Sequence, residues 1–197
     1  MPRIEEAQRT ERRRSLVDAA RRLLARAGYR SLTVDDVCRE AGVSKGAFYT
    51  YFEGKHDLLL ALLDEEAASV RSLMEDVERE DPSGTQRLRR FARAMLERGE
   101  DPGTLQLPAD LWAEMSSDPQ VRERWRAAMA ERRAVLRSWI DRAIEAGELA
   151  PLPSNALAAI VLALGDGLML HHALDPSGFR WTNVRRALDM LLAGAAR

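Results

Sequence analysis

Apolar residues recur along this chain at helical spacing, and no segment shows the strict alternation that is typical of a half-buried strand. Residues 12–28 carry one apolar stripe with arginines on the other faces, and the stripe consists of Leu16, Val17, Ala20, Leu23, Leu24 and Ala27. Gly28 follows directly, and glycine often ends a helix because it tolerates the left-handed conformation. The pattern therefore predicts an all-α protein whose first helix ends near residue 28.

Two short helices are expected next. Thr33 can cap a helix that ends at Ala41-Gly42, because a hydroxyl at this position accepts a hydrogen bond from a free backbone N–H. Ser44 can cap the following helix, which we expect to run for about two turns and to end at Glu53-Gly54. The tight turn between the two helices is typical of a helix-turn-helix.

Six further helices are predicted over the rest of the chain. Turn residues at 81–82, 100–108, 118–119, 151–154 and 175–178 separate them. Asp118-Pro119 has the order of an N-cap followed by proline at the first helical position. The expected ranges are about 55–80, 84–98, 111–116, 119–146, 155–174 and 180–195. We therefore expect about nine helices, in a three-helix domain of residues 1–55 and a larger helical domain of residues 56–197.

The aromatic residues after Ser44 divide between two faces. At about 100° per residue, Phe48 and Phe52 share one face and are expected to hold the small domain together. Tyr49 and Tyr51 are then left to present their hydroxyls outward. Gly46 lies on the face opposite the phenylalanines, where a small residue lets the helix backbone approach a groove floor closely.

The outward residue types suit double-stranded DNA. Ala47 and Thr50 can meet base edges or a thymine methyl, and Lys45 can reach guanine. The hydroxyl of Tyr49 and the ammonium of Lys55 suit phosphates. The two lysines are the only ones in the chain. A solvated surface helix with mixed polar residues is the alternative interpretation.

The segment TVDDVCREAGVSKGAFYTYFEGKHDLLLALL, preceded by AGYRSL, closely resembles the DNA-binding domain of the TetR family of bacterial regulators, and the resemblance covers residues 12–63. It implies an all-helical homodimer with a small N-terminal reading domain and a larger ligand-sensing and dimerising domain. The stretches LWAEMSSDP and GDGLMLHHALDP look like the AcrR-like branch. Thr50 departs from the bulky ring that family members often have at its position, which leaves the base preference open.

Family roles carried over by position put Thr33, Tyr49 and Lys55 on phosphates and Lys45, Ala47 and Thr50 in the groove. The full set of expected DNA-binding residues is Thr33, Ser44, Lys45, Gly46, Ala47, Tyr49, Thr50, Tyr51 and Lys55.

The distribution of charge agrees with a polyanionic partner at one end of the chain. Residues 1–55 carry 12 basic and 8 acidic side chains, a net charge of +4, and the remainder carries 18 against 23, a net charge of −5. One cysteine suits a reducing compartment, and the N-terminal residues lack the apolar segment of a signal peptide. The longest apolar run, Leu157 to Leu170, is short for a bilayer and contains Asp166, so we expect a cytoplasmic protein.

The sequence favours neither an enzyme nor a metal protein. It has no nucleophile elbow and no phosphate-binding glycine loop, and Cys38 is expected to be a small core residue. His171 and His172 are adjacent, so on a helix they point about 100° apart and do not converge on one ion. We expect no cofactor and no metal.

Methionine and tryptophan side chains in the larger domain either form plain core or line an apolar cavity for an effector. Asp166, between two glycines, is either a structural carboxylate where two helices touch or a polar anchor for that effector. The candidate effector-binding residues are Met74, Phe91, Met95, Trp112, Met115, Trp125, Met129, Asp166, Met169 and His172.

The predicted helix 155–174 is apolar on more than one face, so part of it needs a partner outside the protein's own body. Pairing it and the last helix with their symmetry mates gives a homodimer. The candidate interface residues are Leu157, Val161, Leu164, Leu168, Val184, Leu188 and Leu191.

The sequence therefore predicts a ligand-responsive transcriptional regulator, most simply a repressor. It would bind a palindromic operator and be released by a mostly apolar small molecule. The alternatives are a helical carrier or enzyme that binds a hydrophobic small molecule without a DNA role, and a sequence-indifferent DNA-coating protein.

Overall fold

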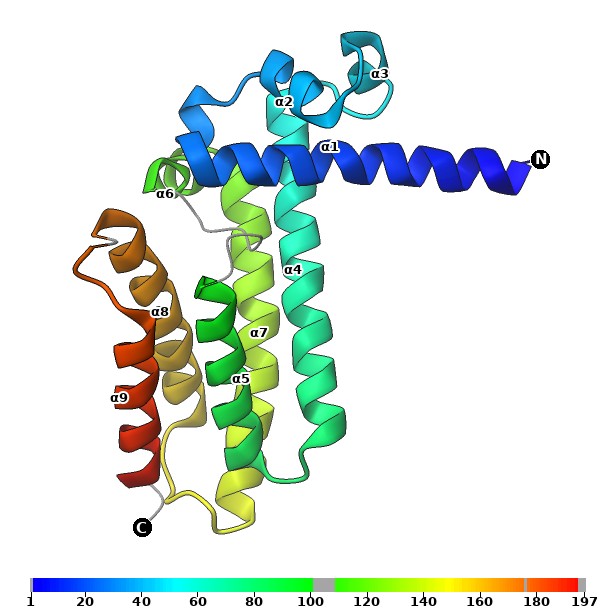
Figure 1. Ribbon diagram of the computed structural model, residues 1–197. Helices are drawn as coiled ribbons and strands as arrows, with labels where there is room; N and C mark the ends of the chain where they lie inside the picture. The colour runs from blue at the N-terminus through cyan, green and yellow to red at the C-terminus, as the bar shows by residue number, and fades with distance from the viewer. Residues whose placement is uncertain (1, 101–108, 176, 195–197) are drawn as a thin grey trace. The chain divides into compact units, whose positions relative to one another are not determined.

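The computed structural model describes residues 2–100, 109–175 and 177–194, with side chains for all of these except residues 2–7, 109, 110, 115, 189 and 191–194. The described chain is all-α and contains no strand (Figure 1). Its helices are α1 (Pro2–Ser31), α2 (Val34–Ala41), α3 (Lys45–Tyr49), α4 (Lys55–Glu80), α5 (Gly84–Glu100), α6 (Ala109–Ser117), α7 (Pro119–Glu145), α8 (Ser154–Leu174) and α9 (Trp181–Gly194). The predicted fold class is confirmed.

Local capping signals account for the start of α3 and for both ends of α2. Gly28 interrupts α1 with a φ of 76°, and Gly42 closes α2 with a φ of 68°, so both occupy the positive-φ region that glycine tolerates. Thr33 and Ser44 cap α2 and α3, since their hydroxyl oxygens accept hydrogen bonds from Asp36 N and Ala47 N at 3.2 Å.

The predicted length of α3 is wrong. The helix ends at Tyr49 rather than near Glu53, because Thr50 N and Tyr51 N turn to the carbonyls three residues back, Ala47 O and Phe48 O. Bonds of this i→i+3 type tighten the last turn and end the α-helical run.

The chain divides into two compact units, each described here by itself. Unit 1 comprises Met1–Glu66 and Gly103–Arg124, and unit 2 comprises Ala67–Pro102 and Trp125–Arg197. Helices α4 and α7 contribute residues to both units. Unit 1 extends beyond residue 55, where we expected the DNA-binding domain to end. The boundary between the DNA-binding domain and the larger domain stays a prediction.

The core of unit 1 forms where α1 packs on α2 and α2 packs on α3. Phe48 is fully buried and Phe52 is nearly so, with their ring centroids 5.7 Å apart. Cys38 is buried, as expected. Other buried side chains of this core are Leu16, Val17, Ala20, Leu24, Val37, Leu58 and Leu62. The predicted inward face of the segment after Ser44 is therefore confirmed.

The core of unit 2 is built from α4, α5, α7 and α8. Trp139 is fully buried and its ring lies edge-on to Phe91, with centroids 6.0 Å apart. The cluster consists of Val70, Met74, Val77, Phe91, Leu136, Trp139, Ile140 and Ala158. Met74 and Phe91, which we expected to face an effector, are buried in this cluster, and their effector role stays a prediction.

Two polar groups fix the corner between α4 and α5. Arg87 is almost fully buried, and its guanidinium donates to Asp81 O at 2.7 Å and to Glu78 O at 3.3 Å, which satisfies carbonyls at the end of α4. Glu148, after α7, accepts from Ser83 Oγ at 2.7 Å and Thr85 N at 2.9 Å. Bonds from Thr85 and Ser83 lower the pKa of the Glu148 carboxyl, so this contact favours the ionised form.

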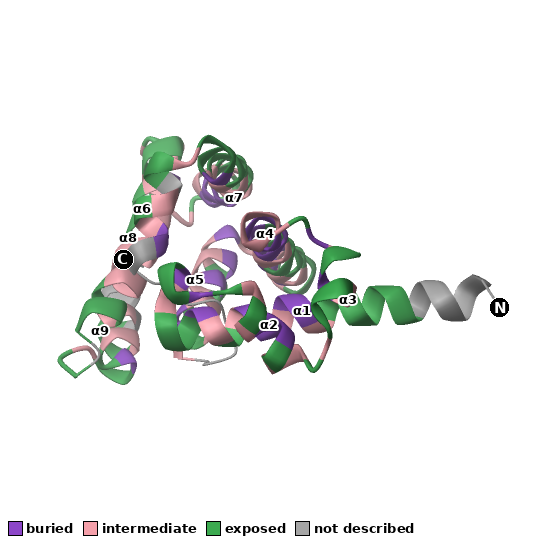
Figure 2. Ribbon diagram, turned by 90° about the horizontal axis from the view of Figure 1, so that it is seen from above, coloured by how far each residue is buried: buried purple, intermediate pink, exposed green. Residues whose placement is uncertain are grey.

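Helix α8 leaves much of its apolar surface uncovered. Ile160, Leu164 and Leu174 are more than half exposed, and only Ala158 of this helix is buried (Figure 2). By length and composition alone, α8 could cross a membrane. The helix extends beyond the apolar run of residues 157–170 at both ends.

Replacing Gly84 with alanine should destabilise unit 2, because the new Cβ would collide with the backbone of α7. It would lie 2.9 Å from Ala143 N and closer still to the carbonyl oxygen of Trp139. Overpacking of this kind costs about 1–3 kcal/mol of unfolding free energy. Thermal unfolding followed by circular dichroism measures the loss. Gly46→Ala is the control, since a Cβ there meets only Ser44 Oγ at 3.9 Å. An unchanged melting temperature for Gly84→Ala would contradict this packing.

Candidate nucleic-acid interface

The turn between α2 and α3 is held by backbone hydrogen bonds. Gly42 N donates to Arg39 O at 3.3 Å and Val43 N donates to Cys38 O at 3.0 Å, which satisfies carbonyls at the end of α2. The left-handed Gly42 reverses the chain so that Ser44 can cap α3 at once. The geometry is that of a helix-turn-helix, in which the second helix is presented at the surface.

The outer face of α3 brings most of the predicted DNA-binding residues together. Ser44, Lys45, Gly46, Tyr49 and Thr50 are exposed, and Tyr49 has 58% of its surface open to solvent. Ala47, Tyr51 and Lys55 are half-buried, and Thr33 is exposed at the start of α2. The Tyr49 ring stands edge-on to buried Phe48, with centroids 5.3 Å apart, so the core also positions this outward tyrosine.

Lys45 is held by a carboxylate of the neighbouring helix. Its Nζ lies 2.6 Å from Asp35 Oδ1, and both side chains are more than half exposed. The hydrogen bond to Asp35, and then its charge, raise the pKa of the Lys45 ammonium. Exposed pairs of this kind contribute little to stability, so an incoming phosphate can compete for the lysine. No pattern in the sequence indicates this pair.

Two of the predicted hydroxyl contacts are already engaged within the protein. The Thr33 hydroxyl donates to Asp36 Oδ2 at 2.6 Å, and the Thr50 hydroxyl donates to Gly46 O at 3.1 Å. The Thr33 bond, followed by the contact with Arg39, lowers the pKa of Asp36. Each threonine must release its present acceptor before its hydroxyl can donate to a phosphate or a base.

Lys55 fastens the first turn of α4 to the end of α1. Its Nζ donates to Arg30 O at 3.3 Å and lies 4.2 Å from the centroid of the Tyr29 ring, a cation–π contact. Tyr29 is buried, and burial raises the pKa of its hydroxyl, with Glu114 and Asp118 adding to the effect. The phosphate role of Lys55 stays a prediction, and the structure adds a positioning role.

Asp118 joins two helix starts within unit 1. One carboxylate oxygen accepts from Gln120 N at 2.8 Å and Val121 N at 3.0 Å, so the predicted N-cap of α7 is confirmed. The other lies 2.9 Å from Nε2 of His56, in the first turn of α4. The bond from Val121 is the largest of the causes that lower the pKa of Asp118. The pair is separated by 62 residues, so no local pattern could have predicted it.

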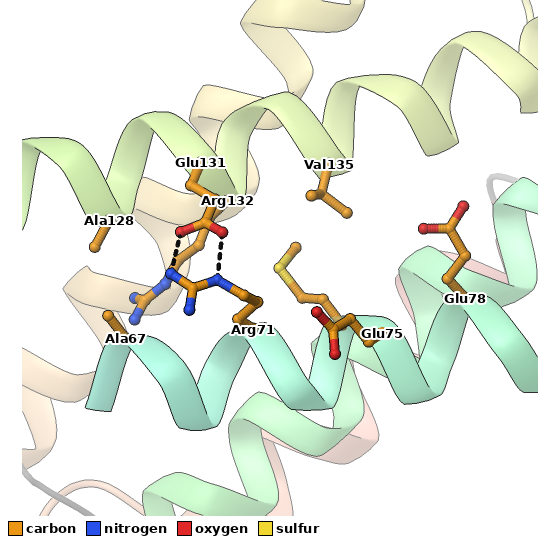
Figure 3. Close-up of a pocket in the computed structure, with 9 residues that line it drawn as sticks. Ala67, Arg71, Glu75, Glu78, Ala128, Glu131, Arg132 and Val135 are labelled. Atoms are coloured by element: carbon orange, nitrogen blue, oxygen red, sulfur yellow. Dashed lines mark hydrogen bonds and ion pairs between the residues drawn. The ribbon is translucent and has the colours of Figure 1, made fainter. Parts of the chain in front are cut away.

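Unit 2 contains a groove of about 140 Å³ between α4 and α7 (Figure 3). Arg71 and Glu131 form a two-pronged ion pair across it, at 2.5 Å and 2.8 Å. The lining residues are Ala67, Arg71, Met74, Glu75, Glu78, Ala128, Glu131, Arg132 and Val135. Of the predicted effector-binding residues, this groove includes only Met74.

The other effector candidates are spread over several helices. Met95, Trp112, Trp125, Met129, Met169 and His172 are half-buried, and the side chain of Met115 lies outside the described residues. Asp166 is half-buried on α8, where burial raises the pKa of its carboxyl to about 6 against an opposing effect of Arg132. Both roles considered for Asp166 remain open at this point.

The predicted interface residues fall into two groups. Leu157 and Val161 pack against the core of unit 2, so they are needed within their own chain. Leu164 is exposed, and Leu168, Val184 and Leu188 are half-buried. The side chain of Leu191 lies outside the described residues. The surface open to a partner is carried by Ile160, Leu164 and Leu174 of α8 and by Met190 of α9.

Comparison with known proteins assigns both parts of the chain. Residues 16–62 match the family model "Bacterial regulatory proteins, tetR family", and residues 84–197 match "BetI-type transcriptional repressor, C-terminal". The HTH-type transcriptional repressor AcnR of Corynebacterium diphtheriae is 26% identical over 192 residues, 97% of this chain and 95% of that protein. The HTH-type transcriptional regulator BetI of Agrobacterium fabrum is 41% identical over 69 residues, 35% of this chain and 30% of that protein.

A solved structure shows the same fold. The TetR-family transcriptional regulator from Agrobacterium tumefaciens superposes with a TM-score of 0.81 at 18% identity, covering 96% of this chain and all of that one. The chain belongs to the TetR family of transcriptional regulators, with a C-terminal domain of the BetI type. The family expected from the sequence is confirmed. For the C-terminal domain, which we expected to be AcrR-like, the matching model is the BetI-type one.

Replacing Asp35 with asparagine should strengthen binding to DNA of any sequence, because it releases Lys45 and removes a negative charge beside α3. The log–log dependence of affinity on salt should steepen by about 0.9, the value for one added phosphate contact. Fluorescence anisotropy with a duplex of arbitrary sequence measures both. Asp76→Asn is the charge-matched control, since Asp76 pairs with Arg79 on α4 in unit 2. Equal salt slopes for the two variants would show that Asp35 does not restrain Lys45.

Proposed function

We propose that the protein is a cytoplasmic transcriptional repressor that binds a palindromic operator as a homodimer and is released by a mostly apolar effector. The observation that carries the proposal is the exposed outer face of α3, fixed from below by buried Phe48 and Phe52. The names of the relatives support repression, since AcnR and the matched C-terminal model are both described as repressors.

Reading of the operator is assigned to the outward residues of α3. Lys45, Ala47 and Thr50 face base edges in the major groove, and the small Gly46 lets the backbone approach closely. Tyr49, with its exposed hydroxyl, contacts a phosphate and fixes the register. A carrier without a DNA role would have no use for this surface.

The homodimer is assigned to the uncovered apolar surface of α8 and α9. Ile160 lies about one helical turn from Leu164 and about four turns from Leu174, so all three fall within an arc of about 80° and form one stripe. A second copy of the chain covers this stripe better than a bilayer does, because Asp166 lies in the middle of α8 and the C-terminal family model spans the helix. A twofold pair of reading helices about 34–36 Å apart matches one duplex turn.

Replacing Leu164 with arginine should produce monomers and weaken operator binding by at least tenfold, although every α3 residue is intact. Ala134→Arg, at an exposed position of α7, is the matched control and should remain dimeric. Sedimentation analysis gives the mass, and gel shifts use a duplex selected from a randomised pool together with its single half-site. A wild-type mass of 22.1 kDa, that of one chain, would rule out the dimer.

The effector is assigned to unit 2, with Asp166 as its polar anchor. Burial raises the pKa of this carboxyl to about 6, so the ionised form is disfavoured where it lies. An apolar side chain would be more stable at such a position, and residues that reduce stability tend to mark functional sites. The proposed effector is therefore largely apolar and carries one cationic or hydrogen-bond-donating group.

Replacing Asp166 with asparagine should raise the unfolding free energy by about 2–3 kcal/mol at pH 7. Because the pKa of Asp166 is higher in the folded state than in the unfolded state, the contribution of its protonated form to wild-type stability is fully present below about pH 4. That contribution is lost as pH rises to about 6. Asparagine does not titrate, so the variant should not show this loss. Unfolding curves at pH 4, 5, 6 and 7 test this. If the carboxylate is instead a structural partner of Arg132, the variant will be less stable than wild type at pH 7.

The same variant tests the anchor role. Apolar amines and alcohols that raise the melting temperature of the wild-type protein should fail to do so for Asp166→Asn. Operator affinity without effector should be unchanged. Ligands that stabilise both proteins equally would place the effector elsewhere.

A further inference from the structure

The positive charge of the first 55 residues does not lie on the helix-turn-helix. Residues 33–55, which contain α2 and α3, carry three basic and four acidic side chains, a net charge of −1. Residues 1–32, which contain α1, carry nine arginines and four acidic side chains, a net charge of +5. The part of the protein that attracts a polyanion is therefore α1, which contributes none of the residues assigned to DNA so far.

Most of the α1 arginines are neutralised within unit 1. Arg22 and Arg26 pair with Glu40 at 2.7 Å and 3.3 Å. Arg13 and Arg21 lie 3.5 Å and 3.6 Å from the carboxylate of Glu65. Arg14 pairs with Asp18 one turn along the helix. The pairs with Glu40 and Glu65 hold α1 against α2 and α4, whereas the Arg14 pair lies within α1.

Arg9 and Arg12 differ from the other arginines of this helix. Among the described side chains they form no ion pair or hydrogen bond, and both are exposed. Glu11, between them in sequence, points to another face of the helix. Glu5 and Glu6 precede them, and their side chains lie outside those described.

Arg9 and Arg12 lie on the face of α1 whose later residues are buried in the core. Helical spacing puts Arg9, Arg12 and Arg13 on the same side as Leu16 and Ala20, which are almost completely buried. The guanidinium of Arg13 lies 5.2 Å from the centroid of the Phe52 ring, which shows that this side faces the segment after α3. The inward face of α1 therefore changes from apolar to cationic where the core ends.

The cationic part of α1 extends beyond the core. Residues 8–14 are exposed, and Leu16 is the first buried residue among the described side chains. At 1.5 Å per residue, this exposed part of α1 is about 10 Å long (Figure 1). An isolated helical segment of this length is marginal in water, and a partner that binds its cationic face would stabilise it.

We propose that the face of α1 that carries Arg9 and Arg12 is a second DNA-contacting element, in which these two arginines bind phosphates of the duplex bound by α3. This inference rests on the proposed operator binding. Arginine suits the role because its planar guanidinium donates to two phosphate oxygens at once and stays charged. The contacts carry no base information, so they add affinity and speed of association equally for every sequence.

The helix-turn-helix and the α1 extension carry different net charges, so they should contribute differently to DNA binding. The helix-turn-helix segment has a net charge of −1 and its Lys45 is paired, so it adds discrimination with little general attraction. The α1 extension adds general attraction without discrimination. Loss of Arg9 and Arg12 should therefore weaken binding to all duplexes and leave the ratio of specific to non-specific affinity unchanged.

The test compares two double variants of equal net charge in the full-length chain. Arg9→Gln/Arg12→Gln removes the proposed contacts. Arg14→Gln/Arg79→Gln is the control, because Arg14 lies on the opposite side of α1 and Arg79 belongs to α4 in unit 2. Glutamine keeps a high helix propensity, and circular dichroism checks that both variants fold. Affinities are measured over a salt series with a pool-selected duplex and with its scrambled counterpart.

The Arg9→Gln/Arg12→Gln protein is expected to lose about 0.9 of log–log salt slope for each phosphate contact removed, on both duplexes alike. Equal slopes for the two double variants on the scrambled duplex would overturn the inference, even if wild-type protein binds the selected duplex specifically. A change confined to the selected duplex would also overturn it, because phosphate contacts cannot depend on sequence. A wild-type protein that does not distinguish the duplexes would instead contradict the proposed operator binding.

Discussion

The burial of two phenylalanines is the constraint on which the reading surface depends. Helix α3 is five residues long, far below the length at which an isolated helix is stable in water. It persists because Phe48 is fully buried and Phe52 is 97% buried in the core of unit 1, while Ser44 and Gly42 fix its start. The outward residues can then be small and polar, since none of them is needed to hold the helix in place.

Ion pairs organise the surface of the same unit. Glu40 and Glu65 each contact two arginines of α1, and Asp35 holds Lys45 at the start of α3. Each exposed pair is worth at most about 1 kcal/mol, so their main effect is on where charge is available rather than on stability. The lysine of the reading helix is paired, whereas Arg9 and Arg12 of α1 form no ion pair among the described side chains.

Features that depend on neighbouring residues were predictable from the sequence. The caps at Thr33, Ser44 and Asp118 and the helix end at Gly42 follow from side-chain chemistry within three residues, and the structure has all four. The helix-turn-helix and its inward face followed from these caps and from the spacing of the phenylalanines.

Features that depend on distant residues were not predictable. The contacts of Lys55 with Tyr29 and of His56 with Asp118 join segments 26 and 62 residues apart. The early end of α3 reflects backbone bonds that no side-chain pattern encodes. Periodicity shows that Met74 and Phe91 face inward, but it cannot distinguish a filled core from a cavity. The structure has both residues in the core, and Met74 also lines the groove between α4 and α7.

The pairing of Lys45 with Asp35 and the stacking of Lys55 on Tyr29 have a chemical consequence. Arginine supplies almost all the positive charge of this chain, and guanidinium groups stay protonated and resist acylation. The only side-chain amines are Lys45, 62% exposed at the start of α3, and half-buried Lys55 at the start of α4. Acetylation of the chain's lysines would therefore remove charge only from residues 1–55. It would modify Lys45, at the start of the helix that we propose reads the operator, more readily than the half-buried Lys55.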